Sequence, residues 1–444
     1  MGDRMSDATL LAKAVYNSAQ VAEVVVGHGA LTRIAAVYQR HFSGPACLIA
    51  DQNTWAAAGK AVAAELLAAG VPFRTYVLPA QPRPKPSVEL AEAVLAIVAQ
   101  DDSTPVSIGS GVLNDLVKYA AFRLDRPYLC VATACSMDGY TSAGAPLSDK
   151  GFKMTIACRP ARVVLADLDV LCAAPPAMTG WGYGDLAGKV AAGGDWIIAD
   201  ELEIEKIDTV AWPMVQNGLN RWLGQPRLIR SGDPEMLAGL FTGLTIVGLA
   251  MEAHGSSRPA SGAEHQIAHL WEMDDLQFAG ERVSHGACVA VATVAVLRLY
   301  DWLLNQNLRL LDVAAIVAAA PDMGQKEAAI RDAFGSPDIA ARATEETRAK
   351  HIGPDAHRAR LDHLREIWPP LRRLLRGRLT ESPTMAAMLH LAGAPAEAAE
   401  IGVDRAHLRQ TILNARFLRS RYTVLDLLDD TGLLEQAVDA TLPA

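Results

Sequence analysis

Short apolar runs alternate with helical patterns between residues 46 and 166, and this alternation restricts the fold more than any other feature of the sequence. Strands are expected at 46–50, 73–78, 106–108, 128–134 and 163–166, and helices at 56–69, 87–99 and 114–124. Strand–helix–strand alternation indicates a parallel sheet covered by helices. In such sheets ligands bind beyond the carboxyl ends of the strands, so a binding site is expected at that edge.

The pattern changes from about Ala174 onward, where strand signals fade and long segments with helical periodicity dominate. Helices are expected at 186–200, 234–253, 261–273, 286–305 and 384–391. The sequence therefore predicts an α/β domain over 1–174 and an all-α domain over 175–444. Segment 325–378 is rich in charge and alanine, and we expect peripheral helices and loops there, broken at Pro337, Pro354, Pro369 and Pro370.

Composition limits the class of partner. The 444 residues are 50% hydrophobic and 20% charged, as in ordinary globular proteins, and the formal net charge of -9 argues against nucleic acid as the main partner. The six cysteines form no CxxC pair, and we expect them to be reduced residues of the core. No signal peptide is expected, and the most apolar stretches, near 240–251 and 287–297, are expected to be too short for a membrane span. These features predict a cytoplasmic protein with no membrane partner.

A glycine-containing turn, Ser107–Asp115, lies between an expected strand and an expected helix. Glycines let the backbone approach a pyrophosphate, and a helix N-terminus offers free N–H groups to it. Gly109, Ser110, Gly111, Val112 and Leu113 are therefore candidate dinucleotide contacts, although the turn is not a GxGxxG fingerprint and a purely structural role is equally open.

Asp51 follows an early strand, where an acid can bind the ribose hydroxyls of a dinucleotide. The alternative, an N-cap for the helix that follows, is equally open. A second polar segment, 133–142, crowds hydroxyls and one carboxylate after a later strand. Such a cluster is either an internally bonded turn or a ligand surface, and its position favours the ligand surface.

Histidines gather in a short part of the helical region and predict a metal site. Ser261 and Glu264 have the spacing of a capping box, which predicts a helix start, and His265 and His269 then share one face of that helix. His285 is expected to open the next helix. Asp185, at another expected helix start, completes a set of one carboxylate and two imidazoles with His265 and His285, and such a set suits a catalytic zinc with an open position for substrate.

Together these motifs resemble the iron-type alcohol dehydrogenase and dehydroquinate synthase superfamily, and more narrowly the glycerol-1-phosphate dehydrogenases, especially their bacterial branch. The resemblance follows the family's order over nearly the whole chain. It is carried by GSGVLNDLVKYA (109–120), VATACSMDGYTS (131–142), GFKMTIACRPARVVLADLDVL (151–171), GYGDLAGK (182–189), DW (195–196), SGAEHQIAHLWEM (261–273), SHG (284–286) and SRYTVLDLLDDTGLLE (420–435).

The resemblance implies an N-terminal Rossmann-like domain, a helical metal-binding domain of the dehydroquinate synthase-like kind, and a site in the cleft between them, in a homo-oligomer that is often a dimer. It implies zinc or nickel on Asp185, His265 and His285, and substrate contacts from Asp138 and His269. The implied NAD(P) contacts are Asp51, Gly109, Ser110, Gly111, Val112, Leu113, Thr133, Ser136 and Ser142. One departure is Ala134-Cys135, where the family usually has Ala-Pro.

The activity that the resemblance implies is reduction of dihydroxyacetone phosphate to sn-glycerol 1-phosphate by NAD(P)H, with the metal polarising the carbonyl. A polyol dehydrogenase, a dehydroquinate synthase-like cyclase and a non-catalytic relative are the alternatives. Phosphate contacts are suggested by location alone, at Lys150, Lys153 and Lys189, while Lys118 is expected on an exposed helix face. NADH or NADPH preference, and whether the product enters phospholipid metabolism, stay open.

Overall fold

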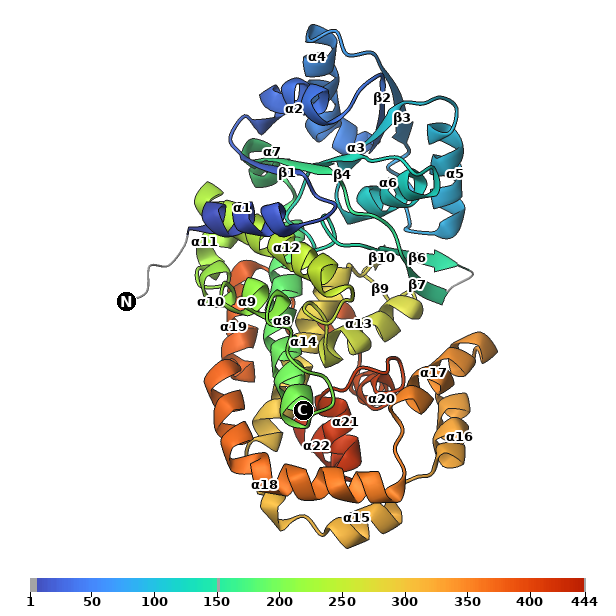
Figure 1. Ribbon diagram of the computed structural model, residues 1–444, viewed down its shortest axis with the longest axis vertical. Helices are drawn as coiled ribbons and strands as arrows, with labels where there is room; N and C mark the ends of the chain where they lie inside the picture. The colour runs from blue at the N-terminus through green and yellow to red at the C-terminus, as the bar shows by residue number, and fades with distance from the viewer. Residues whose placement is uncertain (1–5, 150–151, 443–444) are drawn as a thin grey trace. The chain divides into compact units, whose positions relative to one another are not determined.

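The computed structural model describes residues 6–149 and 152–442, and the chain divides into two compact units (Figure 1). Unit 1 comprises Met1–Leu186, Val210–Ser257 and Leu391–Ala394, and unit 2 comprises Ala187–Thr209, Arg258–His390 and Pro395–Ala444. This division differs from the expected boundary at residue 174, because α12 (Pro234–His254) packs against α1 (Asp7–Asn17) and α7 (Leu168–Ala173) and so belongs to unit 1.

A six-stranded parallel sheet forms the centre of unit 1, with the strand order β1-β8-β5-β4-β2-β3. The strands are β1 (Glu23–Gly27), β2 (Ala46–Asp51), β3 (Phe73–Leu78), β4 (Thr104–Gly109), β5 (Leu129–Ala132) and β8 (Val163–Asp167). The four inner strands are buried almost throughout, which explains their continuous apolar runs, whereas the edge strands β1 and β3 are half-buried. The five expected strands are confirmed, and the edge strand β1 was not expected.

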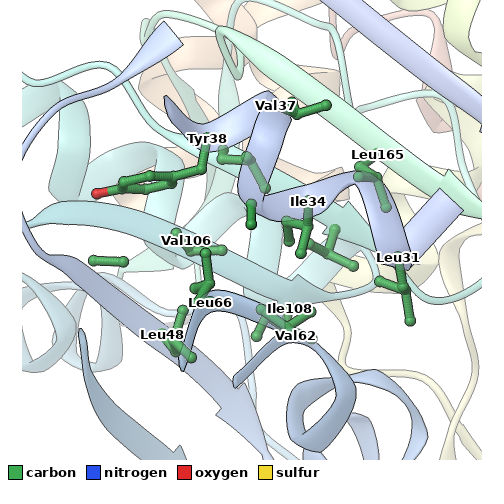
Figure 2. Packing of buried hydrophobic residues seen from close by; sticks show 14 of the residues in the cluster. Leu31, Ile34, Val37, Tyr38, Leu48, Val62, Leu66, Val106, Ile108 and Leu165 are labelled. Carbon is green, nitrogen blue, oxygen red and sulfur yellow. The ribbon is translucent and has the colours of Figure 1, made fainter. Parts of the chain in front are cut away.

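Helices cover the sheet on two faces. Ile34, Val37 and Tyr38 of α2 (Ile34–His41) and Val62 and Leu66 of α4 (Lys60–Ala68) pack on the strands, as Figure 2 shows. The strand residues in this cluster alternate, Ala46, Leu48 and Ala50 in β2, so the residues between them face the opposite side. There α5 (Val88–Val98) packs beside α6 (Gly111–Arg123), and α6 packs on β4.

The other elements of unit 1 surround this sheet. They are α1 (Asp7–Asn17), η1 (Ala30–Arg33), α3 (Gln52–Thr54), the π-turn η2 (Trp55–Gly59), the antiparallel hairpin β6 (Ala145–Asp149) and β7 (Phe152–Ile156), α7 (Leu168–Ala173), the start of α8 (Pro176–Glu201), α9 (Ala211–Gln216), α10 (Leu219–Trp222), α11 (Pro226–Arg230) and α12 (Pro234–His254). The hairpin was not expected, because its two strands are short and mixed in polarity.

Unit 2 is helical and contains the rest of α8. Its further elements are α13 (Ala263–Met273), the short hairpin β9 (Gln277–Phe278) and β10 (Glu281–Arg282), α14 (His285–Leu303), η3 (Leu308–Leu310), α15 (Val313–Ala319), α16 (Met323–Ala333), α17 (Pro337–Lys350), α18 (Pro354–Arg378), α19 (Ser382–Ala392), η4 (Ala398–Ile401), α20 (Arg405–Ala415), α21 (Val424–Asp430) and α22 (Leu434–Thr441). The expected helices of this region are all present, with ends that differ by several residues.

Prolines in the charged segment behave in two ways. Pro337 and Pro354 open α17 and α18, where their missing N–H is not needed. Pro369 and Pro370 lie inside α18, so the expectation that they break the helix was wrong. The helix continues through them because its apolar face is buried, at Leu361, Leu364, Trp368, Leu371 and Leu375.

The two most apolar helices are longer than the sequence indicated. α12 has 21 residues and α14 has 19, so both are long and apolar enough to cross a membrane, and the expectation that these stretches are too short was wrong. Most of the apolar window of each helix is buried inside the protein, 67% in α12 and 83% in α14, as in the core helices of soluble proteins. The six cysteines are free thiols, as expected, and all except the half-buried Cys172 are buried.

Candidate functional site

The carboxyl ends of β2 and β4 mark a switch point of the sheet in unit 1. The two strands are neighbours, but the helix that follows β2 packs on one face while α6, which follows β4, packs on the other. Loops that leave in opposite directions open a crevice at the strand ends, and nucleotides bind in such crevices. Asp51 ends β2 and Gly109 ends β4, so both candidate residues lie where the sequence predicted.

Asp51 is the N-cap of α3. Its Oδ1 accepts the backbone N–H of Thr54 at 2.8 Å, and the Thr54 hydroxyl accepts the N–H of Asp51 at 3.0 Å in return. Asp51 therefore has the N-cap role that was one of the two alternatives. Because Asp51 is only half-buried, this bond leaves part of the carboxylate at the strand end accessible to a ligand.

The glycine turn is closely packed. A Cβ on Gly109 would lie 2.4 Å from Cδ1 of Leu113, and a Cβ on Gly111 would lie 3.2 Å from Cγ of Met137. Ser110 is the N-cap residue of α6, but its side chain makes no capping bond. The turn thus presents the first N–H groups of a 13-residue helix, next to the half-buried residues Ser110, Gly111 and Val112.

The polar segment 133–142 lies beside this turn. The N–H of Thr133 donates to the carbonyl of Gly109 at 3.2 Å, and the hydroxyl of Thr141 donates to the carbonyl of Thr245 on α12 at 2.7 Å. Ser142 donates to the carbonyl of Gly139 at 3.1 Å. The segment is therefore internally bonded as well as placed at the ligand-binding edge, and Ser136, Asp138 and Ser142 are half-buried there.

Lys118 is fully buried, so the expectation of an exposed helix face was wrong. Its ammonium donates to the carbonyls of Gly139 and Gly144 at 2.8 and 2.9 Å, and its Nζ lies 3.4 Å from Oδ1 of Asp115. No local pattern indicated this burial, because the acceptors are backbone carbonyls 21 and 26 residues away in the chain.

Two candidate site residues of unit 1, Asp138 and Asp185, are in contact. The backbone N–H of Asp138 donates to Oδ2 of Asp185 at 3.0 Å. Asp185 is fully buried, near the middle of the 26-residue helix α8 rather than at the expected helix start. Gly182, one turn earlier, packs so tightly on the carbonyl of Cys135 that a Cβ there would lie 1.8 Å from that oxygen. Close packing thus places Asp185 beside the polar segment.

Three imidazoles gather in unit 2. His265 and His269 lie one turn apart on α13, and their ring centroids are 5.9 Å apart. His285 is the first residue of α14, with its ring centroid 5.4 Å from that of His265 and 5.9 Å from that of His269. The predicted shared face and the predicted helix start at His285 are confirmed. His254, in the same stretch of sequence, ends α12 in unit 1 and bonds Ser256.

Two of these imidazoles have a carboxylate at Nδ1. Nδ1 of His265 lies 2.7 Å from Oε1 of Glu264, and Nδ1 of His285 lies 3.0 Å from Oε1 of Glu272. Ligand atoms of His269, Glu272 and His285 all lie within 4.8 Å of one another. Histidines that bind metals are commonly held at Nδ1 by a carboxylate, which leaves Nε2 for the metal. Neither glutamate was predicted to make this contact.

Burial controls the charge of this cluster. Burial, followed by the charges of Lys189, His285, His269 and Arg421, holds the pKa of His265 well below its ordinary value. The imidazole is therefore neutral at neutral pH, as a metal ligand must be. Burial and the charge of Asp195 raise the pKa of Glu264 to about 8.

The buried carboxylate of Asp195 holds together the helices that carry the histidine cluster. Its carboxylate accepts the N–H of Ala263 at 2.7 Å, the hydroxyl of Tyr300 at 2.6 Å and the N–H of Val424 at 2.8 Å. It thereby joins α8 to the starts of α13 and α21 and to α14. The predicted Ser261 cap is not formed, because α13 begins at Ala263 with Gly262 as N-cap, and Glu264 instead accepts the N–H of Gly262 at 2.9 Å.

Of the three candidate phosphate contacts, the structure describes the side chain of Lys189. Lys150 and the side chain of Lys153 lie outside the described residues. Lys189 lies in unit 2, fully buried on α8, where its charge acts on His265 and Glu264.

Comparisons with known proteins agree with this geometry. Residues 25–175 match the family described as iron-containing alcohol dehydrogenase. The chain is 28% identical over 417 residues to glycerol-1-phosphate dehydrogenase [NAD(P)+] of Bacillus velezensis, covering 94% of this chain and 93% of that protein. It is 31% identical over 290 residues to the enzyme of the same name from Bacillus subtilis, covering 65% and 74%.

Solved structures share the fold. NADH-dependent butanol dehydrogenase A of Thermotoga maritima superposes with a TM-score of 0.62 at 14% identity, over 96% of this chain and 97% of that chain. At this identity the likeness supports the Rossmann-like and helical architecture and says nothing of the substrate.

Proposed function

The chain belongs to the glycerol-1-phosphate dehydrogenase family of iron-containing alcohol dehydrogenases, and we propose that it interconverts dihydroxyacetone phosphate and sn-glycerol 1-phosphate with NAD(P) and a divalent metal. The observation that carries this proposal is the cluster of His265, His269 and His285, two of which have a carboxylate at Nδ1. An imidazole whose Nδ1 is held by a carboxyl group presents Nε2 to a metal, and so this cluster is suited to bind a transition metal.

The proposed metal ligands are Asp185, His265 and His285. The choice of Asp185 as a ligand is supported by the way in which α8 and α14 run in the same direction. Within unit 2, Gly188 packs against Val289, and Gly194 packs against Tyr300 further along both helices, so the two helices run in the same direction. Asp185 precedes Gly188 by about one turn of α8, and His285 precedes Val289 by about one turn of α14.

The donor set fits a catalytic metal. One carboxylate and two imidazoles are the ligands of many catalytic zinc sites, which keep a further position open for substrate. We propose Zn²⁺, with Ni²⁺ as the alternative, since nitrogen and oxygen donors suit both. When bound, such a metal acts as a Lewis acid that polarises the carbonyl of dihydroxyacetone phosphate.

The chain's own residues orient the reactants. The proposed substrate contacts are Asp138 and His269, which offer a carboxylate and an imidazole to the substrate hydroxyls. Asp138 is fixed by its backbone bond to Asp185, and His269 by its place on α13 one turn after His265. Fixed placement matters because a misplacement of about 1 Å can cost on the order of 10²-fold in rate.

The proposed nucleotide site is the crevice at the ends of β2 and β4. The turn Gly109–Leu113 would hold the pyrophosphate with its free N–H groups, and Asp51 would bind the ribose. Thr133, Ser136 and Ser142 would line the nicotinamide end, because their segment continues from β5 beside the turn. The chemistry that a nicotinamide bound there would supply is hydride donation to a carbonyl.

The proposal includes a homodimer and a cytoplasmic location, which rest on the family resemblance. Lys189 is retained as a candidate contact for the substrate phosphate, on the basis of its charge beside His265.

The first test is NADH and NADPH oxidation with dihydroxyacetone phosphate, before and after chelation and after zinc or nickel is returned. We expect turnover that chelation removes and metal restores, and loss of both bound metal and turnover in His265→Ala. Near-normal turnover in metal-free protein would contradict the metal-dependent mechanism. Oxidation of glycerol but not of glycerol 1-phosphate would show a polyol dehydrogenase instead.

A further inference from the structure

Lys118 makes a set of contacts that the proposed chemistry does not use. Its ammonium lies in the protein interior and faces three acceptors, the carbonyls of Gly139 and Gly144 and the carboxylate of Asp115. An ammonium group has three N–H donors, so these three acceptors match its full donor set.

A buried ammonium is costly unless it is paired and hydrogen-bonded. An apolar side chain of similar length would fill the same space without this cost, but it would leave the carbonyl of Gly144 without the donor that Lys118 provides. The contacts of Lys118 thus fix both ends of residues 139–144. Asn114, one turn earlier on α6, adds a bond from its Nδ2 to the carbonyl of Gly139 at 3.3 Å.

The fixed residues lie directly beside a proposed catalytic group. Asp138 precedes Gly139, and its N–H donates to Asp185 at 3.0 Å. Ser142 lies between the two held carbonyls and donates to Gly139 at 3.1 Å. A movement of the Gly139 carbonyl therefore moves Asp138 and Ser142, and through Asp138 it changes the hydrogen bond to Asp185.

We infer that Lys118 is a positioning residue that holds segment 138–144 in register with the start of α6. The same helix begins with the turn Gly111–Leu113, so α6 connects the proposed nucleotide turn to the proposed substrate segment through one rigid element. The roles of Asp138, Ser142 and Asp185 rest on the proposed function. The structural part of the inference, that Lys118 holds the segment, does not.

The structural part is tested by hydrogen–deuterium exchange of the whole metal-free chain, wild type against Lys118→Met. We expect peptides that cover 133–144 to exchange roughly tenfold faster or more in the variant, because two carbonyl anchors are lost. Leu66→Ala, in the core on the opposite face of the sheet, is the matched control for lost stability, and it should leave the relative protection of 133–144 unchanged. Unchanged exchange in Lys118→Met would overturn the inference.

A second variant separates anchoring from simple neutralisation of charge. If Lys118 only neutralises Asp115, the double variant Asp115→Asn/Lys118→Met should regain wild-type protection of 133–144, and the inference fails. If it anchors the carbonyls, the double variant should stay as unprotected as Lys118→Met. Lys118→Gln, which keeps a shorter donor, is expected to be intermediate and serves if the methionine variant does not fold.

Turnover provides the functional readout. In metal-loaded Lys118→Met we expect kcat for dihydroxyacetone phosphate to fall by about 10²-fold, because Asp138 loses its fixed placement. The KM for NAD(P)H should rise by a smaller factor, because Ser142 moves with the same segment while the nucleotide turn 109–113 keeps its place. Leu66→Ala should keep its kcat below its melting temperature. Equal kcat values in wild type and Lys118→Met would overturn the functional part. If wild type itself shows no turnover, the proposed function fails, while the exchange result still decides the structural part.

Discussion

Oε1 of Glu264 lies 2.7 Å from Nδ1 of His265, the next residue along α13, while the backbone N–H of Gly262 holds the same oxygen at 2.9 Å. Adjacent helix residues normally point in different directions, and here the glutamate turns back to the helix N-terminus and meets the imidazole there. With a proton on Nδ1, the lone pair of Nε2 is free for a metal.

Replacing this carboxylate should weaken metal binding. For Glu264→Gln we expect the affinity for zinc, measured above the Glu264 pKa of about 8 so that the carboxyl is ionised, to fall by about 10- to 100-fold. The reason is that an amide accepts the Nδ1 proton less strongly than a carboxylate. Competition with a chromogenic chelator measures the affinity without reference to turnover. Glu281→Gln, at an exposed residue of β10, is the control, and an unchanged affinity in Glu264→Gln would show that the contact does not orient His265.

Two glycines of α12 should respond to alanine in opposite directions. A Cβ on Gly248 would lie 2.2 Å from Oγ1 of Thr141 and 2.7 Å from the carbonyl oxygen of Asp138, so Gly248→Ala should destabilise the protein by about 1–3 kcal/mol and displace the polar segment. Among the described residues, a Cβ on Gly239 would have only Oδ2 of Asp7 within 4 Å, at 3.6 Å, so Gly239→Ala should stabilise the helix by up to about 1 kcal/mol. Thermal unfolding of both variants checks the prediction, and a stabilised Gly248→Ala would contradict the close packing.

Removal of the buried carboxylate of Asp195 should strongly destabilise unit 2. Asp195→Ala deprives two buried backbone N–H groups and the Tyr300 hydroxyl of their acceptor, and we expect a loss of more than about 3 kcal/mol. Tyr300→Phe removes one donor and should cost only about 1–2 kcal/mol. Denaturant unfolding of the two variants gives the comparison, and similar losses in both would mean that the backbone contacts contribute little.

Thiol reactivity should separate Cys172 from the other cysteines. Burial raises the pKa of Cys130 to about 12 and that of Cys158 to about 11, so near neutral pH these two groups are almost entirely protonated and also inaccessible. Cys172 is half-buried, and we expect iodoacetamide to modify it first in the folded protein.

The pH dependence of that reaction follows from the thiolate. Because the pKa of Cys172 is raised by burial and by the charges of Asp169 and Asp233, its modification rate should rise about tenfold per pH unit through the neutral range. Peptide mass spectrometry locates the label, and denatured protein, in which all six cysteines should react, is the control. Early labelling of Cys130 or Cys158 would contradict the burial of these two side chains.

Local sequence patterns were sufficient for the parts of the fold that local physics controls. The inner strands are continuous apolar runs because both faces of the sheet are covered, and the helix start at His285 follows from the cap at Ser284. The one-turn spacing of His265 and His269 fixes a shared face wherever the helix lies. By contrast, the edge strand β1 and the hairpin β6–β7 are short and half-exposed, so they carry no such pattern.

Contacts between distant segments were decided only by the tertiary structure. From its neighbours in the sequence, Lys118 on α6 was expected to face solvent. It is buried because residues 139–144 fold over it, and their carbonyls accept hydrogen bonds from its ammonium group. Pro369 and Pro370 stay inside a helix because the packing of its apolar face outweighs the lost hydrogen bonds. The sequence by itself determined which residue types could bind a nucleotide and a metal, since those depend on side-chain chemistry and short spacing. The folded chain decided which groups hold them in place, because a hydrogen bond between residues far apart in sequence leaves no periodic trace along the chain.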